Sequence, residues 1–360
     1  MTVTVPAPAA TATVTVAATA PVDPACDVDP AILDKFGRHS VRLSRAHEGS
    51  GFRVQEVLKR MNRGDKVKLA LLGGSGQSAV SPVRKNDHGC RDTRAELFDA
   101  FVPFNAVSEG HGFLTRPNEY GAIAHDRTWH QWLLRDLQSR FGPETIDFVF
   151  GAKAATDSAY FSWCYPAHIG TDADLILVEL AVNDDFVPEH FAAAETLLRS
   201  LLSLPHKPAV VLVDSFALLN ARGDKVSLNG GDAHAHLALR YDVPSVSLRA
   251  AALTAMMAQP EMVVPWFNGD QRHIAAPLHE MLGALVAAYF QEEGCRLARS
   301  GGWDREAERW AERGGKGGEW PAIELLGQIP KVRQRTRSHA LVQDHTFADI
   351  FPHLVAEPRL

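Results

Sequence analysis

The sequence predicts an α/β protein, a three-layer doubly wound sandwich around a central, mostly parallel sheet. Short apolar runs alternate with amphipathic segments through the middle of the chain. The runs are continuously apolar, which is typical of strands that are buried on both faces. Polar or glycine-rich turns follow several of these runs, and in such sheets ligands bind beyond the carboxyl ends of the strands.

The elements follow one another in the order that this fold requires. We predict strands at residues 66–72, 145–150, 174–180, 208–214 and 244–248. Apolar residues at helical spacing predict helices at 51–63, 126–141, 154–165, 188–202, 233–241 and 274–290. Residues 81–125 are rich in Gly, Pro, Asn, His and charged residues, as long loops are.

Composition divides the chain into three parts. Residues 1–48 begin with an uncharged stretch of Ala, Thr, Val and Pro, and we expect a low-complexity, largely disordered N-terminal tail. Residues 49–295 carry the alternating elements and form the globular domain. Residues 296–360 are Gly-rich and charged, and are expected to be a linker and a peripheral extension.

Charge and hydropathy narrow the range of partners. The net charge is −6, and no basic stripe interleaved with aromatic residues is present, so no nucleic-acid partner is expected. The sequence contains no run of 18 apolar residues, so no membrane-spanning helix is predicted. The N-terminus lacks the basic start of a signal peptide, and Lys35 is the first cation. The compartment stays open.

The cysteines and histidines do not predict a metal site. Four widely spaced cysteines contain no C-x-x-C pair, which argues against a zinc ribbon. Two disulfides and four reduced thiols both remain possible for a chain of this size. The histidine pairs, such as His234 with His236, are isolated in the sequence.

The first chemically interesting turn, G-G-S-G-Q-S, follows the strand at 66–72. A serine such as Ser75 on a tight glycine turn at a strand end is exposed above the sheet, which suits a nucleophile. A solvated glycine turn is the simpler alternative. A phosphate-binding loop would need a G-K-[ST] ending, which is absent. The turn also lacks the last glycine of the G-x-S-x-G elbow.

A second turn, V-N-D at residues 182–184, follows the strand at 174–180. The side-chain amide of Asn183 can donate to an oxyanion, and such a donor contributes about 100- to 1,000-fold in rate. Ordinary helix capping by Asn183 or Asp184 ahead of Pro188 is the alternative.

A third turn, G-D-Q-R-H at residues 269–273, precedes the last predicted helix. A carboxylate at Asp270 can orient the imidazole of His273, which can then take a proton from a serine. In the alternative interpretation Asp270 caps the helix and His273 is a surface residue of its first turn.

Together the three turns resemble the blocks of the SGNH (GDSL-like) hydrolase superfamily. Ser75, Asn183 and the D-x-x-H of Asp270 and His273 match residue by residue. Gly74 replaces the Asp of the usual Gly-Asp-Ser, and Ala181 replaces the Gly of G-x-N-D. Residues 151–169 followed by 174–184 resemble fungal SGNH proteins linked to capsule or cell-wall glycans.

The resemblance implies a serine esterase that works through an acyl-enzyme. Ser75 would attack the ester, His273 would act as base and then acid, and Asp270 would hold the imidazole. The N–H groups of Ser75 and Gly151 and the amide of Asn183 would form the oxyanion hole. No cofactor would be needed.

The substrate implied is a small acyl ester, acetyl foremost, on a carbohydrate. Gln77 and Trp266 are the candidate substrate-binding residues, and nothing between the blocks resembles the lid or acyl tunnel of a lipase. Two alternatives stay open at this point. One is an O-acyltransferase on glycans with the same site, and the other is a catalytically idle glycan-binding or scaffold protein.

Overall fold

The computed structural model describes residues 27–74, 127–153, 156–220, 223–224, 226, 228–267 and 271–299. A six-stranded sheet has the order β1-β8-β5-β4-β2-β3. All neighbours in it are parallel except β1 and β8. The strands are β1 (Arg45–His47), β2 (Val67–Gly73), β3 (Ile146–Phe150), β4 (Leu175–Glu179), β5 (Ala209–Asp214) and β8 (Ser245–Ser247), and β6 (Leu219–Asn220) pairs separately with β7 (Gly223–Asp224).

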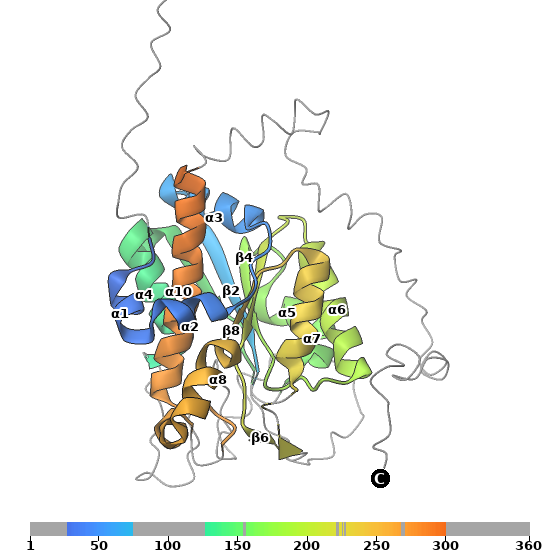
Figure 1. The fold of residues 1–360 in the computed structure, drawn as a ribbon. Helices are drawn as coiled ribbons and strands as arrows, with labels where there is room; N and C mark the ends of the chain where they lie inside the picture. Colours follow the sequence, from blue (N-terminus) through green and yellow to red (C-terminus); the bar gives the residue numbers. More distant parts are fainter. Residues whose placement is uncertain are drawn as a thin grey trace, which may run out of the picture.

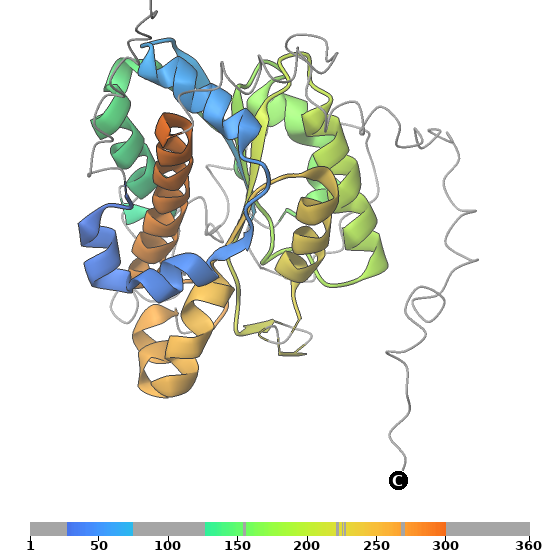
Figure 2. The same cartoon turned by 45° about the horizontal axis from the view of Figure 1, so that its top comes forward.

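Helices cover both faces of the sheet, which confirms the predicted three-layer α/β fold (Figures 1 and 2). One layer contains α3 (Phe52–Asn62), α4 (Trp129–Phe141), α8 (Leu248–Ala258) and α10 (Ala276–Arg299). The other contains α5 (Ser158–Ile169), α6 (Pro188–Leu202) and α7 (Gly230–Tyr241). The short elements are α1 (Pro30–Phe36), α2 (Arg38–Leu43), α9 (Val263–Trp266) and the 3₁₀ turns Pro143–Thr145 and Pro260–Met262.

Strand β4 illustrates why the apolar runs are continuous. Leu175 and Leu177 point into the core beneath α4 and α10, whereas Ile176 and Val178 point into the core beneath α5 and α6. Each of these side chains is buried, and full burial stabilises the fold by roughly 1.5–3 kcal/mol per side chain. Both faces of the strand are therefore apolar.

Residues 27–48 differ from the tail that the sequence predicted for 1–48. They form α1, α2 and β1, and Val28 and Val41 are each only 2% exposed. The side chain of Asp29 accepts from the N–H of Ala31 at the start of α1, and the Asp29 N–H donates to Gln291 Oε1 at 2.7 Å. This segment therefore packs against the end of α10, which runs to Arg299, past the predicted end at 290.

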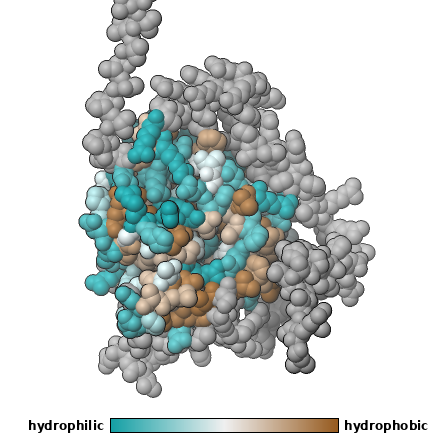
Figure 3. All heavy atoms as spheres, viewed as in Figure 1, coloured by the Kyte–Doolittle hydropathy of each residue, from teal (hydrophilic) through white to brown (hydrophobic). Residues whose placement is uncertain are grey.

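The surface over α1 and α10 is mostly hydrophilic, and apolar residues gather around α8 (Figure 3). Lys35 of α1 forms an ion pair with Glu280 of α10 on the hydrophilic face. Within the described part of the chain, no helix has both the length and the apolar character to cross a membrane.

Two cysteines are cross-linked. Cys164 on α5 and Cys295 on α10 are both in disulfide bonds. Of the two alternatives that the sequence left open, disulfides rather than reduced thiols therefore hold for these two residues.

Candidate active site

The candidate site lies where the chain changes direction across the sheet. From β2 the chain passes to β3 on one side and then to β4 on the other, which is the order of a flavodoxin-like sheet. The carboxyl ends of β2 and β4 therefore flank the switch point, where ligands bind in open α/β sheets. The N–H of Gly74, directly after β2, donates to the carbonyl of Glu179 at the end of β4 (3.1 Å).

Gly74 and Asn183 lie against each other at this point. A Cβ atom on residue 74 would be 2.1 Å from the Thr156 carbonyl oxygen and 3.0 Å from Asn183 Cγ. No larger residue fits there, which explains why Gly replaces the Asp of the usual Gly-Asp-Ser. Ser75 is the next residue along the chain, and it lies outside the described residues, as do Gln77 and Asp270.

The turn that carries Asn183 is fixed by its neighbours. The N–H groups of Asn183 and Asp184 both donate to the Leu180 carbonyl, at 3.0 and 2.9 Å. The alternative of helix capping is wrong, because Val187 is the N-cap of α6 and makes no side-chain cap. Asp184 is buried and accepts instead from the N–H and Oγ of Ser158, at 2.9 and 2.5 Å. Asn183 itself is partly buried, and its Oδ1 is buried.

The assignment of Gly151 to the oxyanion hole needs correction. Its N–H donates to the carbonyl of Leu71 at 2.9 Å, which continues the pairing of β3 with β2. A Cβ on residue 151 would be 2.4 Å from Ile169 Cγ2, so close packing explains the glycine. The N–H of Gly151 therefore cannot donate to an oxyanion without breaking the sheet.

His273 lies in a constrained loop between α9 and α10. A β-bridge between Phe267 and Ile274 closes the loop, and the Gln271 carbonyl accepts from the N–H of Leu218 at 2.9 Å. Leu218 follows the carboxyl end of β5, so the loop sits at the same edge of the sheet as Asn183. Gln271 has a left-handed φ of 53°, a strain often found near functional sites. His273 is 2% exposed and is therefore not a surface residue of the α10 first turn.

A second buried histidine lies near the first. His279 Nδ1 accepts from the Trp129 N–H at 3.3 Å. Burial, and to a smaller extent the positive charge that His273 can carry, lowers the pKa of His279 to about 3. The imidazole of His279 is therefore neutral across the physiological range.

This neutral histidine makes the fold sensitive to acid. The folded pKa of His279, about 3, lies below the ordinary value of 6.5, so between pH 6.5 and 3 the unfolded chain binds one more proton. We expect the free energy of unfolding to fall by about 1.4 kcal/mol per pH unit through this group as pH drops through that window. Urea titrations at pH 7, 6 and 5 measure it. His279→Gln should flatten the slope by that amount, and an unchanged slope would contradict the assignment.

The candidate Trp266 and the aromatic residues of α5 have different environments. Trp266, on α9, is partly buried against the core, and its carbonyl accepts from the Ala275 N–H at 2.8 Å. On α5, Phe161 is fully buried in the core whereas Trp163 is 71% exposed. Trp266 is thus placed beside the His273 loop, while Phe161 belongs to the packing.

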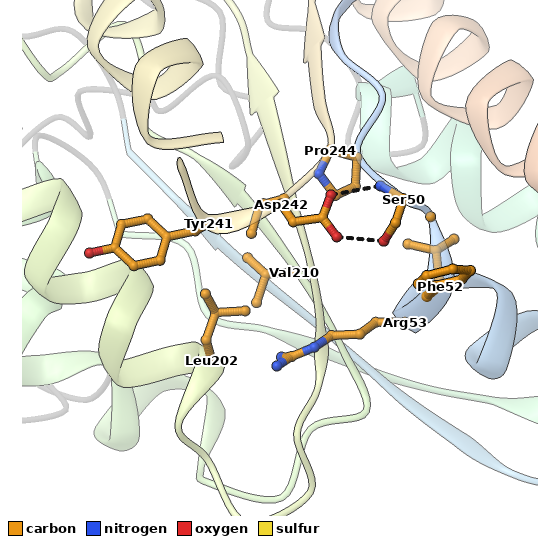
Figure 4. Close-up of a pocket in the computed structure, with 11 residues that line it drawn as sticks. Ser50, Phe52, Arg53, Leu202, Val210, Tyr241, Asp242 and Pro244 are labelled. Atoms are coloured by element: carbon orange, nitrogen blue, oxygen red, sulfur yellow. Dashed lines mark hydrogen bonds between the residues drawn. The ribbon is translucent and has the colours of Figure 1, made fainter. Parts of the chain in front are cut away.

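A small cavity at the other edge of the sheet is a separate feature (Figure 4). It lies at the start of β5 and before β8, where the Asp242 carboxylate accepts from the N–H and Oγ of Ser50, at 2.7 and 2.5 Å. Arg53 lines it and donates to the Pro208 carbonyl at 2.9 Å; burial lowers the pKa of Arg53 to about 10. Its volume is about 30 Å³, room for a water rather than an ester.

The described residues contain no group of three His, Cys, Asp or Glu side chains arranged to hold a metal ion. His234 and His236, which are close in the sequence, have side chains in different environments. His234 is buried between two carboxylates, whereas His236 is exposed on the same helix.

Among known proteins, the likeness is one of structure. No family model and no curated protein matches the sequence. Two crystal structures of a two-domain esterase (CEX) active on acetylated mannans match with TM-scores of 0.50 and 0.51 at 18% identity. The match covers 71% of this chain and 56% of that one, so the chain spans about half of the two-domain esterase.

A more distant likeness is to Axe2, an acetylxylan esterase from Geobacillus stearothermophilus, with a TM-score of 0.38 at 16% identity over 64% of this chain and 94% of that one. At these identities the CEX match establishes a shared α/β fold.

Proposed function

We propose that this protein is a serine esterase that removes a small acyl group, acetyl foremost, from a carbohydrate through an acyl-enzyme. The contact of Asn183 with Gly74, the residue before Ser75, is the observation that carries the proposal. It places the candidate oxyanion donor against the residue that precedes the candidate nucleophile in the sequence, at the switch point of the sheet.

The proposed reaction follows from these positions. Ser75 Oγ attacks the ester carbonyl carbon while His273 takes the Ser75 proton, and Asp270 orients the imidazole. The Asn183 amide and the Ser75 N–H stabilise the oxyanion. The sugar hydroxyl leaves with the proton from His273. Water then attacks the acyl-serine and gives up a proton to His273. When the tetrahedral intermediate collapses, His273 returns that proton to Ser75 Oγ, and the acid and free Ser75 are released.

Three observations support a carbohydrate as the alcohol part of the ester. The shared fold includes an esterase active on acetylated mannans, and the sequence resembles SGNH proteins linked to glycans. Trp266 beside the His273 loop offers a partly buried aromatic surface on which a sugar ring can stack. Acetate release from acetylated mannan and xylan tests this substrate class directly.

The oxyanion donor gives the first kinetic prediction. Asn183→Ala should lower kcat by about 100-fold with KM nearly constant, because the amide acts mainly in the transition state. The measurement is steady-state hydrolysis of p-nitrophenyl acetate. Asn62→Ala, an exposed substitution at the end of α3, should match the wild type. A change confined to KM would make Asn183 a substrate-binding residue instead.

The size of the acyl group gives the second. We expect kcat/KM to fall from p-nitrophenyl acetate to the octanoate and palmitate esters. A lipase would gain about 0.8 kcal/mol for each methylene group that it buries. A kcat/KM that rises with chain length, with no acetate released from any glycan, would indicate a lipid esterase. Acetyl transfer to an added sugar in preference to water would indicate an acyltransferase.

A further inference from the structure

A buried charge network lies directly behind the proposed oxyanion hole. His234 Nδ1 is 2.8 Å from Asp214 Oδ1, and His234 Nε2 is 2.8 Å from Asp184 Oδ2. Ser245 Oγ donates to Asp214 at 2.6 Å, and Ser158 donates to Asp184 through its N–H and Oγ. All five residues are buried, with at most 2% of each exposed.

The imidazole of His234 is held in its charged form. Burial alone opposes the charge, but hydrogen bonds to Asp184 and Asp214 outweigh it and raise the pKa of His234 to about 10. With both ring nitrogens protonated, each donates to a carboxylate. The cation therefore bridges the turn after β4 to the end of β5.

Two glycines let helix α7 bring this cation close to the turn. A Cβ on Gly230 would be 2.6 Å from the Asp184 Cβ, and one on Gly231 would be 3.3 Å from the Asp214 Cβ. The Asn229 side chain caps the same end of α7 by accepting from the Gly231 N–H at 2.8 Å. The first turn of α7 thus packs directly on the residues that hold His234.

The network reaches the site through one peptide bond. Asp184 is the residue after Asn183, and both their N–H groups donate to the Leu180 carbonyl. A shift of the Asp184 carboxylate would therefore rotate the short turn and move the Asn183 amide relative to Gly74. Misplacement of a catalytic group by about 1 Å can cost on the order of 100-fold in rate.

We infer that His234 is a positioning residue, which fixes Asp184 and through it the turn that aims the Asn183 amide at the oxyanion. The inference rests on the proposed esterase function and adds a residue that acts without touching substrate.

A double-mutant cycle with Asn183 tests the coupling. His234→Gln should lower kcat on p-nitrophenyl acetate by about 10- to 100-fold with KM nearly unchanged. In the Asn183→Ala background the same substitution should change kcat by no more than about twofold, because the amide that His234 positions is gone. Fluorophosphonate titration of active sites corrects each kcat for misfolded protein. His236→Gln, on the exposed face of the same helix, should match the wild type.

Asp214→Asn is the second variant if His234→Gln fails to fold. It keeps the shape of the side chain but removes one of the two charges that hold His234 protonated, and we expect the same pattern with a smaller loss. Equal losses of kcat in the wild-type and Asn183→Ala backgrounds would overturn the positioning role alone. A wild-type protein with neither turnover nor a titratable serine would overturn the proposed function, and this inference with it.

Discussion

Ser75→Ala is expected to abolish esterase turnover and fluorophosphonate labelling while the protein stays folded. Loss of a serine nucleophile in a hydrolase costs about a million-fold in kcat, because no other group forms the acyl intermediate. Gly74, which precedes Ser75, already packs against Asn183 and Thr156, so the change from Ser to Ala leaves that contact intact. The measurements are p-nitrophenyl acetate hydrolysis and peptide mapping of the labelled protein.

Ser78→Ala is the matched control for this experiment, since Ser78 belongs to the same G-G-S-G-Q-S sequence as Ser75. It should keep both labelling and turnover. Labelling that persists in Ser75→Ala, or that maps to Ser78, would refute the assignment of the nucleophile.

His273→Ala should lower kcat by several orders of magnitude, roughly 10⁴-fold or more, because the imidazole moves the proton in both half-reactions. In the wild type, activity should fall in acid as a charged imidazole loses the ability to accept a proton. A profile of kcat/KM against pH measures this. Asp270→Ala should cost less than His273→Ala, since backbone carbonyls can share the orientation of the ring.

His39→Ala, an exposed substitution on α2, serves as the control and should leave the profile unchanged. If His273→Ala retains activity with the same acid limb as the wild type, another group is the base.

The sheet was predictable because its strands are buried on both faces. The run at 174–180 became β4 within one residue at each end, and the strand at 208–214 became β5 to the same accuracy. Amphipathic helices such as α6 followed from the spacing of their leucines, with Pro188 at the start. At these positions the hydrophobic pattern of the sequence agrees with the burial of the same residues in the fold, so the pattern predicts the element.

Other features depend on contacts that spacing does not reveal. The segment 27–48 was assigned to the tail because its neighbours are low in complexity, yet Asp29 and Pro30 together form a helix-start signal. Gly151 matched a motif position, but its N–H is used by the strand ladder. The sequence did not indicate the role of His234, because its two carboxylate partners are 20 and 50 residues away. The roles of Ser75 as nucleophile and of Asp270 as the partner of His273 stay predictions, because both residues lie outside the described part of the chain.

Because Cys164 and Cys295 are in disulfide bonds, the fold depends on the redox conditions under which the protein is made. Thiols stay reduced where glutathione and thioredoxin maintain them, and cross-links of this kind persist where the surroundings are oxidising. A loop closed in this way stabilises by about 2–4 kcal/mol, chiefly by restricting the unfolded chain. Dithiothreitol should therefore weaken the fold without touching a single residue of the sheet edge where Asn183 lies. Recombinant production in a reducing cytosol would give a chain lacking this constraint, so the choice of expression host bears on whether measured activity reflects the native protein.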